Sequence, residues 1–155
     1  MVYTNDEAGD SMEMDTILLN EIYQNSKMGI ETIGQIKQLV HDTTFKKLLN
    51  EQGREYYKIN QEAKEKIWEK GEMVKGISRF AKMNTHLAIG MKTAFDKSPS
   101  HISEMLIQGS AMGIIEASRN KNKYKDVDVD KDILKLNDKL LKTEENNVEQ
   151  LKKFL

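Results

Sequence analysis

Polar side chains that can hold protons or bind cations occur on the apolar seams predicted for the long helices of this chain. Glu116 and Glu144 both fall close to residues that the helical periodicity directs inward. An unpaired buried carboxylate is costly, and it usually acquires a hydrogen-bond donor, a proton or a metal ion. The sequence therefore predicts a polar network inside a helical core, drawn from Gln52, Glu55, Glu116, Asn137 and Glu144, with phenolic hydroxyls from Tyr23, Tyr56 and Tyr57. Within this set, a polar pocket is predicted at Gln52, Tyr56 and Asn137.

No catalytic signature accompanies these residues. The chain has no cysteine, which excludes disulfides, thiolate metal sites and thiol nucleophiles. It also lacks the nucleophile elbow, the phosphate-binding loop, the dinucleotide fingerprint and the paired-histidine zinc motif. We therefore predict no catalytic residue and no resident cofactor, and the sequence favours a protein that is not an enzyme.

Hydrophobic spacing predicts that four long helices position the polar residues. They should run from about 14 to 40, from about 45 to Gly71, from about 100 to 120, and from Asp130 toward the end of the chain. The inward stripe of the first helix comprises Leu18, Ile22, Gly29, Ile33, Ile36 and Val40. The stripe of the second comprises Phe45, Leu48, Gln52, Tyr56, Ile59, Ala63 and Ile67. The stripe of the last comprises Ile133, Leu140, Leu141, Val148, Leu151 and Phe154.

Capping residues and connections complete this outline. Asp42 lies in a short cap-rich turn, so the first two helices should form an antiparallel hairpin. Ser98 and Pro99 signal the start of the third helix, since serine caps and proline suits the first turn. Residues 77–95 predict an additional helix in the crossover between helices two and three. The first helix is expected to be capped by Asp10, Ser11 or Asp15.

A segment of the first predicted helix recurs in the third. Gln-Asn-Ser-Lys-Met-Gly-Ile at residues 24–30 returns as Gln-Gly-Ser-Ala-Met-Gly-Ile at residues 108–114, an offset of 84. A weaker similarity relates the second and fourth helices at an offset of 92, so we predict two related hairpins. Small residues recur three apart on one helix face, and they predict a close crossing of helices one and three at Ser26, Gly29, Ser110 and Gly113. The alternative is that these small residues leave room for a ligand at mid-bundle.

Two related hairpins joined by a long connection resemble the ferritin-like superfamily of four-helix bundles. Members with a di-iron or di-manganese centre take a glutamate from helices one and three and a Glu-x-x-His motif from helices two and four. The nearest matches to that motif begin at Glu55 and Glu144, and both lack the histidine. The resemblance implies, as an alternative function, a di-metal protein or oxidoreductase that binds iron or manganese through Glu21, Glu55, Glu116 and Glu144.

The segment from Ser98 to Ile115 and the segment from Leu140 to Asn147 resemble small bacterial helical proteins without an assigned activity. This similarity covers most of the chain and implies no chemistry. Our leading expectation is a non-enzymatic, metal-free ferritin-like bundle that acts through protein–protein contacts, with a homodimer as its assembly and a further protein partner left unidentified.

Length, composition and charge limit the kinds of binding partner and the cellular location that can be expected. The 155 residues fit one domain, predicted at 14–155, after a flexible acidic tail at 1–13. Lysine and arginine number 24 and acidic residues 25, so no net charge draws the chain to nucleic acid. The first 14 residues do not resemble a targeting peptide, and no apolar run is long enough for a membrane span. A cytoplasmic location without membrane association is therefore expected.

Overall fold

The computed structural model describes residues 6–75 and 96–155, and these residues form four long α-helices. The helices are α1 (Asp6–Ile36), α2 (Thr43–Glu69), α4 (Pro99–Tyr124) and α5 (Lys131–Leu151), followed by a short 3-10 helix, η1 (Lys152–Phe154). No strand occurs in the described part of the chain. The all-α prediction with four long helices is confirmed. The helix predicted in the crossover at 77–95 lies outside the described residues.

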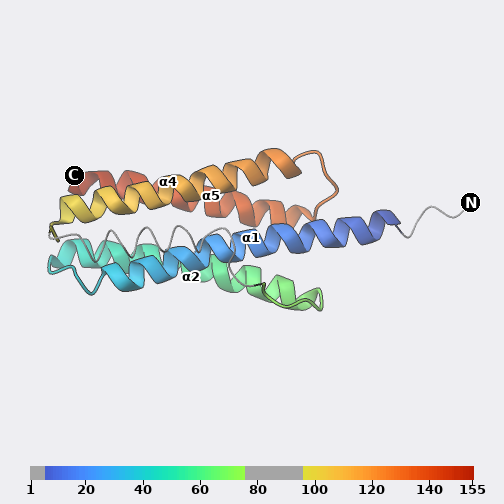
Figure 1. Cartoon of the computed structure of the whole chain (residues 1–155), viewed down its shortest axis with the longest axis horizontal. Coiled ribbons are helices and arrows are strands. Elements are labelled where there is room, and N and C mark those ends of the chain that lie inside the picture. The colour runs from blue at the N-terminus through green and yellow to red at the C-terminus, as the bar shows by residue number, and fades with distance from the viewer. Residues whose placement is uncertain (1–5, 76–95) are drawn as a thin grey trace, which may run out of the picture.

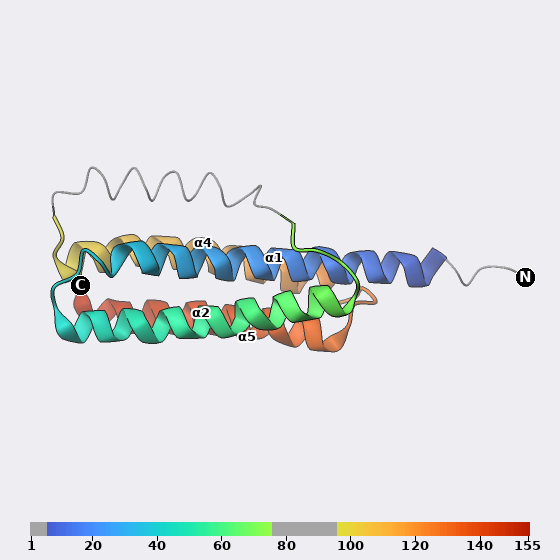
Figure 2. The ribbon, with the colours of Figure 1, turned by 90° about the horizontal axis from the view of Figure 1, so that it is seen from below.

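The helices pack as two antiparallel hairpins, α1 with α2 and α4 with α5 (Figure 1). At one end of the bundle, Asp15 of α1 accepts hydrogen bonds from Lys70, just after α2, and from the backbone N–H of Asp130 between α4 and α5. At the other end, Ser100 of α4 donates to the carbonyl of Leu155, and the ring of Phe154 packs at a tilt against that of Phe45 of α2. Helices α2 and α4 therefore run in the same direction, which Figure 2 also shows.

Local signals account for the helix termini that the sequence predicted. The side chain of Asp42 accepts from the N–H of Phe45, that of Ser98 from His101, and that of Asp130 from Asp132. At the end of α2, Gly71 adopts a positive φ of 72°, and the N–H of Glu72 bonds to the carbonyl of Ile67. This is a Schellman termination, which needs a residue that tolerates the left-handed region.

The first helix begins and ends earlier than predicted. It starts at Asp6, so residues 6–13, expected as part of a tail, form its first turns, and residues 37–39 form a turn. The expected caps Ser11 and Asp15 lie inside the helix. They bond instead to the turn between α4 and α5, where Ser11 Oγ donates to the carbonyl of Asp128 at 2.7 Å. Contacts with this distant turn hold the start of α1 in place.

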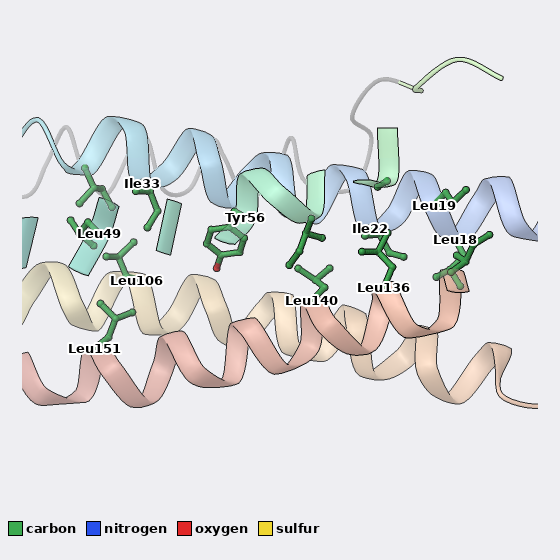
Figure 3. Close-up of a cluster of buried hydrophobic side chains, with 14 of the residues drawn as sticks. Leu18, Leu19, Ile22, Ile33, Leu49, Tyr56, Leu106, Leu136, Leu140 and Leu151 are labelled. Carbon is green, nitrogen blue, oxygen red and sulfur yellow. The ribbon is translucent and has the colours of Figure 1, made fainter. Parts of the chain in front are cut away.

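The core runs along the whole bundle and consists of aliphatic side chains from all four helices, together with the aromatic rings of Phe45, Tyr56 and Tyr124. Figure 3 shows the ring of Tyr56 within this row, with its hydroxyl directed toward α4 and α5. Every member of the predicted second-helix stripe is buried except Leu48, which is half-buried. None of the described helices is long and apolar enough to cross a membrane.

Candidate functional site

A buried acid–phenol pair occupies the middle of the bundle and joins the two hairpins. Tyr56 Oη of α2 donates to Glu144 Oε2 of α5 at 2.6 Å. Both side chains are almost fully buried, with 5% and 3% of their surface exposed. A neutral donor on one hairpin is thus paired with an acid on the other, 88 residues away in the chain.

Each partner of this pair faces a glycine on the neighbouring helix of its own hairpin. A Cβ atom at Gly29 of α1 would lie 2.7 Å from the ring of Tyr56. A Cβ atom at Gly113 of α4 would lie 2.5 Å from Glu144 Oε1. Real Cβ atoms essentially never approach so closely, so each glycine provides the space that its polar neighbour needs.

Burial strongly perturbs the protonation of the pair. It raises the pKa of Glu144 from 4.5 to about 7, against the opposing effect of hydrogen bonds with Tyr56 and Ser110. Burial and the nearby Glu144 raise the pKa of Tyr56 well above its ordinary value of 10.0. The phenol therefore keeps its proton near neutral pH, whereas the carboxyl group exchanges between its acid and its anion.

A small cavity borders the pair. It has a volume of about 30 Å³, which is room for one or two water molecules. Its polar lining comes from Tyr56, Glu144, Ser110, Gln52 and Thr32, and methionine and aliphatic side chains complete the wall. Organic ligands usually occupy cavities of several hundred Å³, so this one is far too small for an organic substrate. The site can bind water and hold or release a proton.

The predicted polar pocket is assembled in part. Gln52 and Tyr56 both line the cavity, and Gln52 Nε2 also donates to the carbonyl of Asn147 and to Gln150 Oε1, each at 3.4 Å. Asn137 is buried elsewhere, where its Nδ2 donates to the carbonyl of Ala117. It therefore joins α5 to α4 outside the cavity.

The four carboxylates of the alternative metal site are not brought together. Glu144 is buried, whereas Glu55 is 46% exposed and pairs with Lys58 at 2.6 Å. Glu116 pairs with Arg119 at 2.9 Å, and Glu21 is half-buried on α1. In residues 6–75 and 96–155, no three histidine or acidic side chains group as metal ligands. These residues do not fit the di-iron or di-manganese centre that the superfamily resemblance implies.

The small residues of the repeat have neighbours that differ in part from those expected. The sequence predicts a crossing of α1 with α4, but Gly29 faces Tyr56 of α2, and Ser26 Oγ accepts from Asn60 of α2 at 3.1 Å. Ser110 lines the cavity.

Near Gly113 the two hairpins do meet. Its carbonyl accepts from Asn25 Nδ2 of α1 at 3.3 Å. The glycine of each segment thus makes room for a large polar side chain of its own hairpin.

Three buried asparagines belong to this polar core and were not predicted: Asn25, Asn60 and Asn147. Asn147 lies beside the Tyr56 hydroxyl, where its hydrogen bond opposes the burial that raises the pKa of Tyr56. Its position three residues after Glu144 placed it on the same face of α5, and this spacing was the available signal.

Comparison of the chain with protein-family models, with curated proteins and with solved structures finds no match.

Proposed function

We propose that this chain is a non-enzymatic, ferritin-like four-helix bundle that acts through protein–protein contacts made by the outer face of α4. The parallel course of α2 and α4, joined by one long connection, supports the ferritin-like assignment, because bundles of that superfamily contain one such crossover. The buried pair does not support catalysis, because its cavity admits only water. A cytoplasmic location belongs to the same proposal and agrees with the absence of cysteine.

The observation that carries the proposal is an exposed helix surface without charge. Between Glu104 and Arg119, four residues of α4 are exposed, and none of them is charged. Two are large and apolar, with 43% of Met112 and 45% of Ile115 exposed. We call the six exposed residues the α4 face: Glu104, Gln108, Ala111, Met112, Ile115 and Arg119.

The outer surface of α5, the helix that pairs with α4, differs from the α4 face. On α5, every exposed residue from Lys131 to Glu149 is charged except Asn146. Charged residues keep a helix surface solvated, whereas an uncharged apolar surface gains free energy when a partner covers it. The α4 face therefore has the character of a contact surface.

Photo-crosslinking in cells that produce the chain naturally tests this function. A photoreactive phenylalanine analogue placed at Met112 should yield discrete adducts, because the α4 face is covered by a protein. The same analogue at Trp68, which is 56% exposed on α2, serves as the control and should yield none. Absence of adducts at Met112, or equal adducts at both positions, would contradict the proposal.

A further inference from the structure

We infer that the partner of the α4 face is a second copy of the same chain, bound through an antiparallel α4–α4 contact about a two-fold axis between Ala111 and Met112. This inference rests on the proposed function because it uses the same surface. It adds the identity of the partner, its orientation and its register.

The first argument is the geometry of the face. A helix advances by about 100° per residue, so the six residues of the α4 face lie within about 50° of one direction around the axis. They extend over about 22 Å along the helix. A second helix can therefore contact all of them at once.

The second argument is that the face is complementary to itself. In an antiparallel pair with the axis between Ala111 and Met112, residues whose numbers sum to 223 lie opposite each other. Ala111 then meets Met112, and Gln108 meets Ile115. At each edge Glu104 meets Arg119 of the second copy, so opposite charges close both ends of an uncharged centre.

Arg119 is accessible to Glu104 of a second copy. Its side chain is 70% exposed, and its present partner Glu116 is three residues away on the same helix. An exposed pair of this kind contributes little free energy, so a second acidic group from another copy can share the guanidinium at small cost. No like charges face each other anywhere along the α4 face.

The third argument comes from the related segment of α1. At the offset of 84, Ala111 and Ile115 of α4 correspond to Lys27 and Glu31 of α1. Those two residues form an ion pair at 3.8 Å on the surface of α1. A partly exposed helix position in this scaffold thus accepts an ion pair, whereas α4 has apolar residues in its place, which a second copy can cover.

Analytical ultracentrifugation over protein concentrations from about 1 µM to 1 mM tests the inference. A single helix pair forms a contact below the standard interface size of about 800 Å² per partner, so we expect reversible dimerisation with a micromolar Kd. Met112→Glu places two like charges beside the axis and should raise Kd at least tenfold. Trp68→Glu, the matched control on α2, should leave Kd within twofold of the wild-type value.

A charge exchange tests the register. Glu104→Arg and Arg119→Glu should each raise Kd severalfold, and the double variant should return it to within about twofold of the wild-type value. The double substitution Ala111→Lys with Ile115→Glu gives α4 the ion-pair spacing of α1, so it keeps the helix folded and should abolish the dimer. Unchanged circular dichroism melting of each variant verifies the fold.

A chain that remains monomeric throughout this range would overturn the inference, as would a dimer insensitive to Met112→Glu or a charge exchange without recovery. The crosslinking experiment separates this failure from failure of the proposed function. An adduct of twice the chain mass supports both proposals. An adduct with a different protein, together with a monomeric chain, retains the proposed function and refutes the inference.

Discussion

Replacing Glu144 by glutamine is predicted to stabilise the protein increasingly as the pH rises. Burial raises the pKa of this carboxyl group from 4.5 to about 7. In the unfolded chain the group regains its ordinary pKa, so between these two values the unfolded state has released a proton that the native state still binds. The free energy of unfolding contributed by Glu144 therefore falls as the pH rises through this interval and is constant outside it.

The size of the effect follows from the two pKa values, 4.5 unfolded and about 7 folded. Each pH unit between them costs about 1.4 kcal/mol, so the full loss is roughly 3 kcal/mol. Glutamine does not titrate, and its carbonyl oxygen can still accept the hydrogen bond from Tyr56. At pH 4 the two proteins should differ by less than about 1 kcal/mol, whereas at pH 8 the variant should gain roughly 3 kcal/mol, or about 6 to 12 °C in Tm.

Urea unfolding followed by circular dichroism at half-unit steps from pH 4 to pH 8.5 measures this difference. Subtracting the wild-type value from the variant value removes the contribution of every other titrating group that the two proteins share. Glu145→Gln, which removes the same charge at an exposed neighbouring position on α5, is the control measured in parallel. A flat difference for Glu144→Gln would refute the raised pKa. A difference that favours the wild-type protein at high pH would show that the native fold stabilises the anion.

Two further predictions concern packing and charge at other sites. Gly29→Ala and Gly113→Ala should each lower the free energy of unfolding by about 1 to 3 kcal/mol, because the new Cβ overlaps a buried neighbour. Gly34 has open space around it, so Gly34→Ala should raise the free energy of unfolding by about 0.5 to 1 kcal/mol. Urea unfolding measures all three, and equal effects would refute the close approach. Asp15→Asn should cost about 1 to 3 kcal/mol, because it leaves the ammonium of Lys70, only 20% exposed, without its anionic partner; a loss below about 0.5 kcal/mol in the same assay would contradict a stabilising ion pair.

The helices were predictable because their signals are local. Asp42, Ser98 and Asp130 each precede an apolar pattern, and each cap accepts a hydrogen bond from an N–H only two or three residues further on. The start of α1 was not predictable in this way. Ser11 and Asp15 have the residue types of caps, but their partners lie at Asp128 and Asp130, more than 100 residues away.

The sequence predicted that Tyr56 and Glu144 belong to a polar core, but it did not predict that they contact each other. Tyr56 and Glu144 each fall on an inward stripe, yet their contact depends on how far one hairpin slides along the other, and helical periodicity does not determine that register. The local sequence did contain the information that excludes two other candidates. Glu55 and Glu116 each have a cation three residues later, Lys58 and Arg119, and this spacing forms surface ion pairs on a helix.

The two repeated segments differ in a way that packing alone does not explain. Their inward glycines, Gly29 and Gly113, each make room for a buried polar side chain, so the requirements of the core account for the residues that they share. The core places no such requirement on their outer positions, where α1 has a charged pair and α4 has Ala111 and Ile115. A second protein surface that covers the apolar residues on α4 would gain free energy, and the charged pair on α1 offers no comparable gain. The proposed contact surface on α4 therefore rests on the difference between the two segments more than on their similarity.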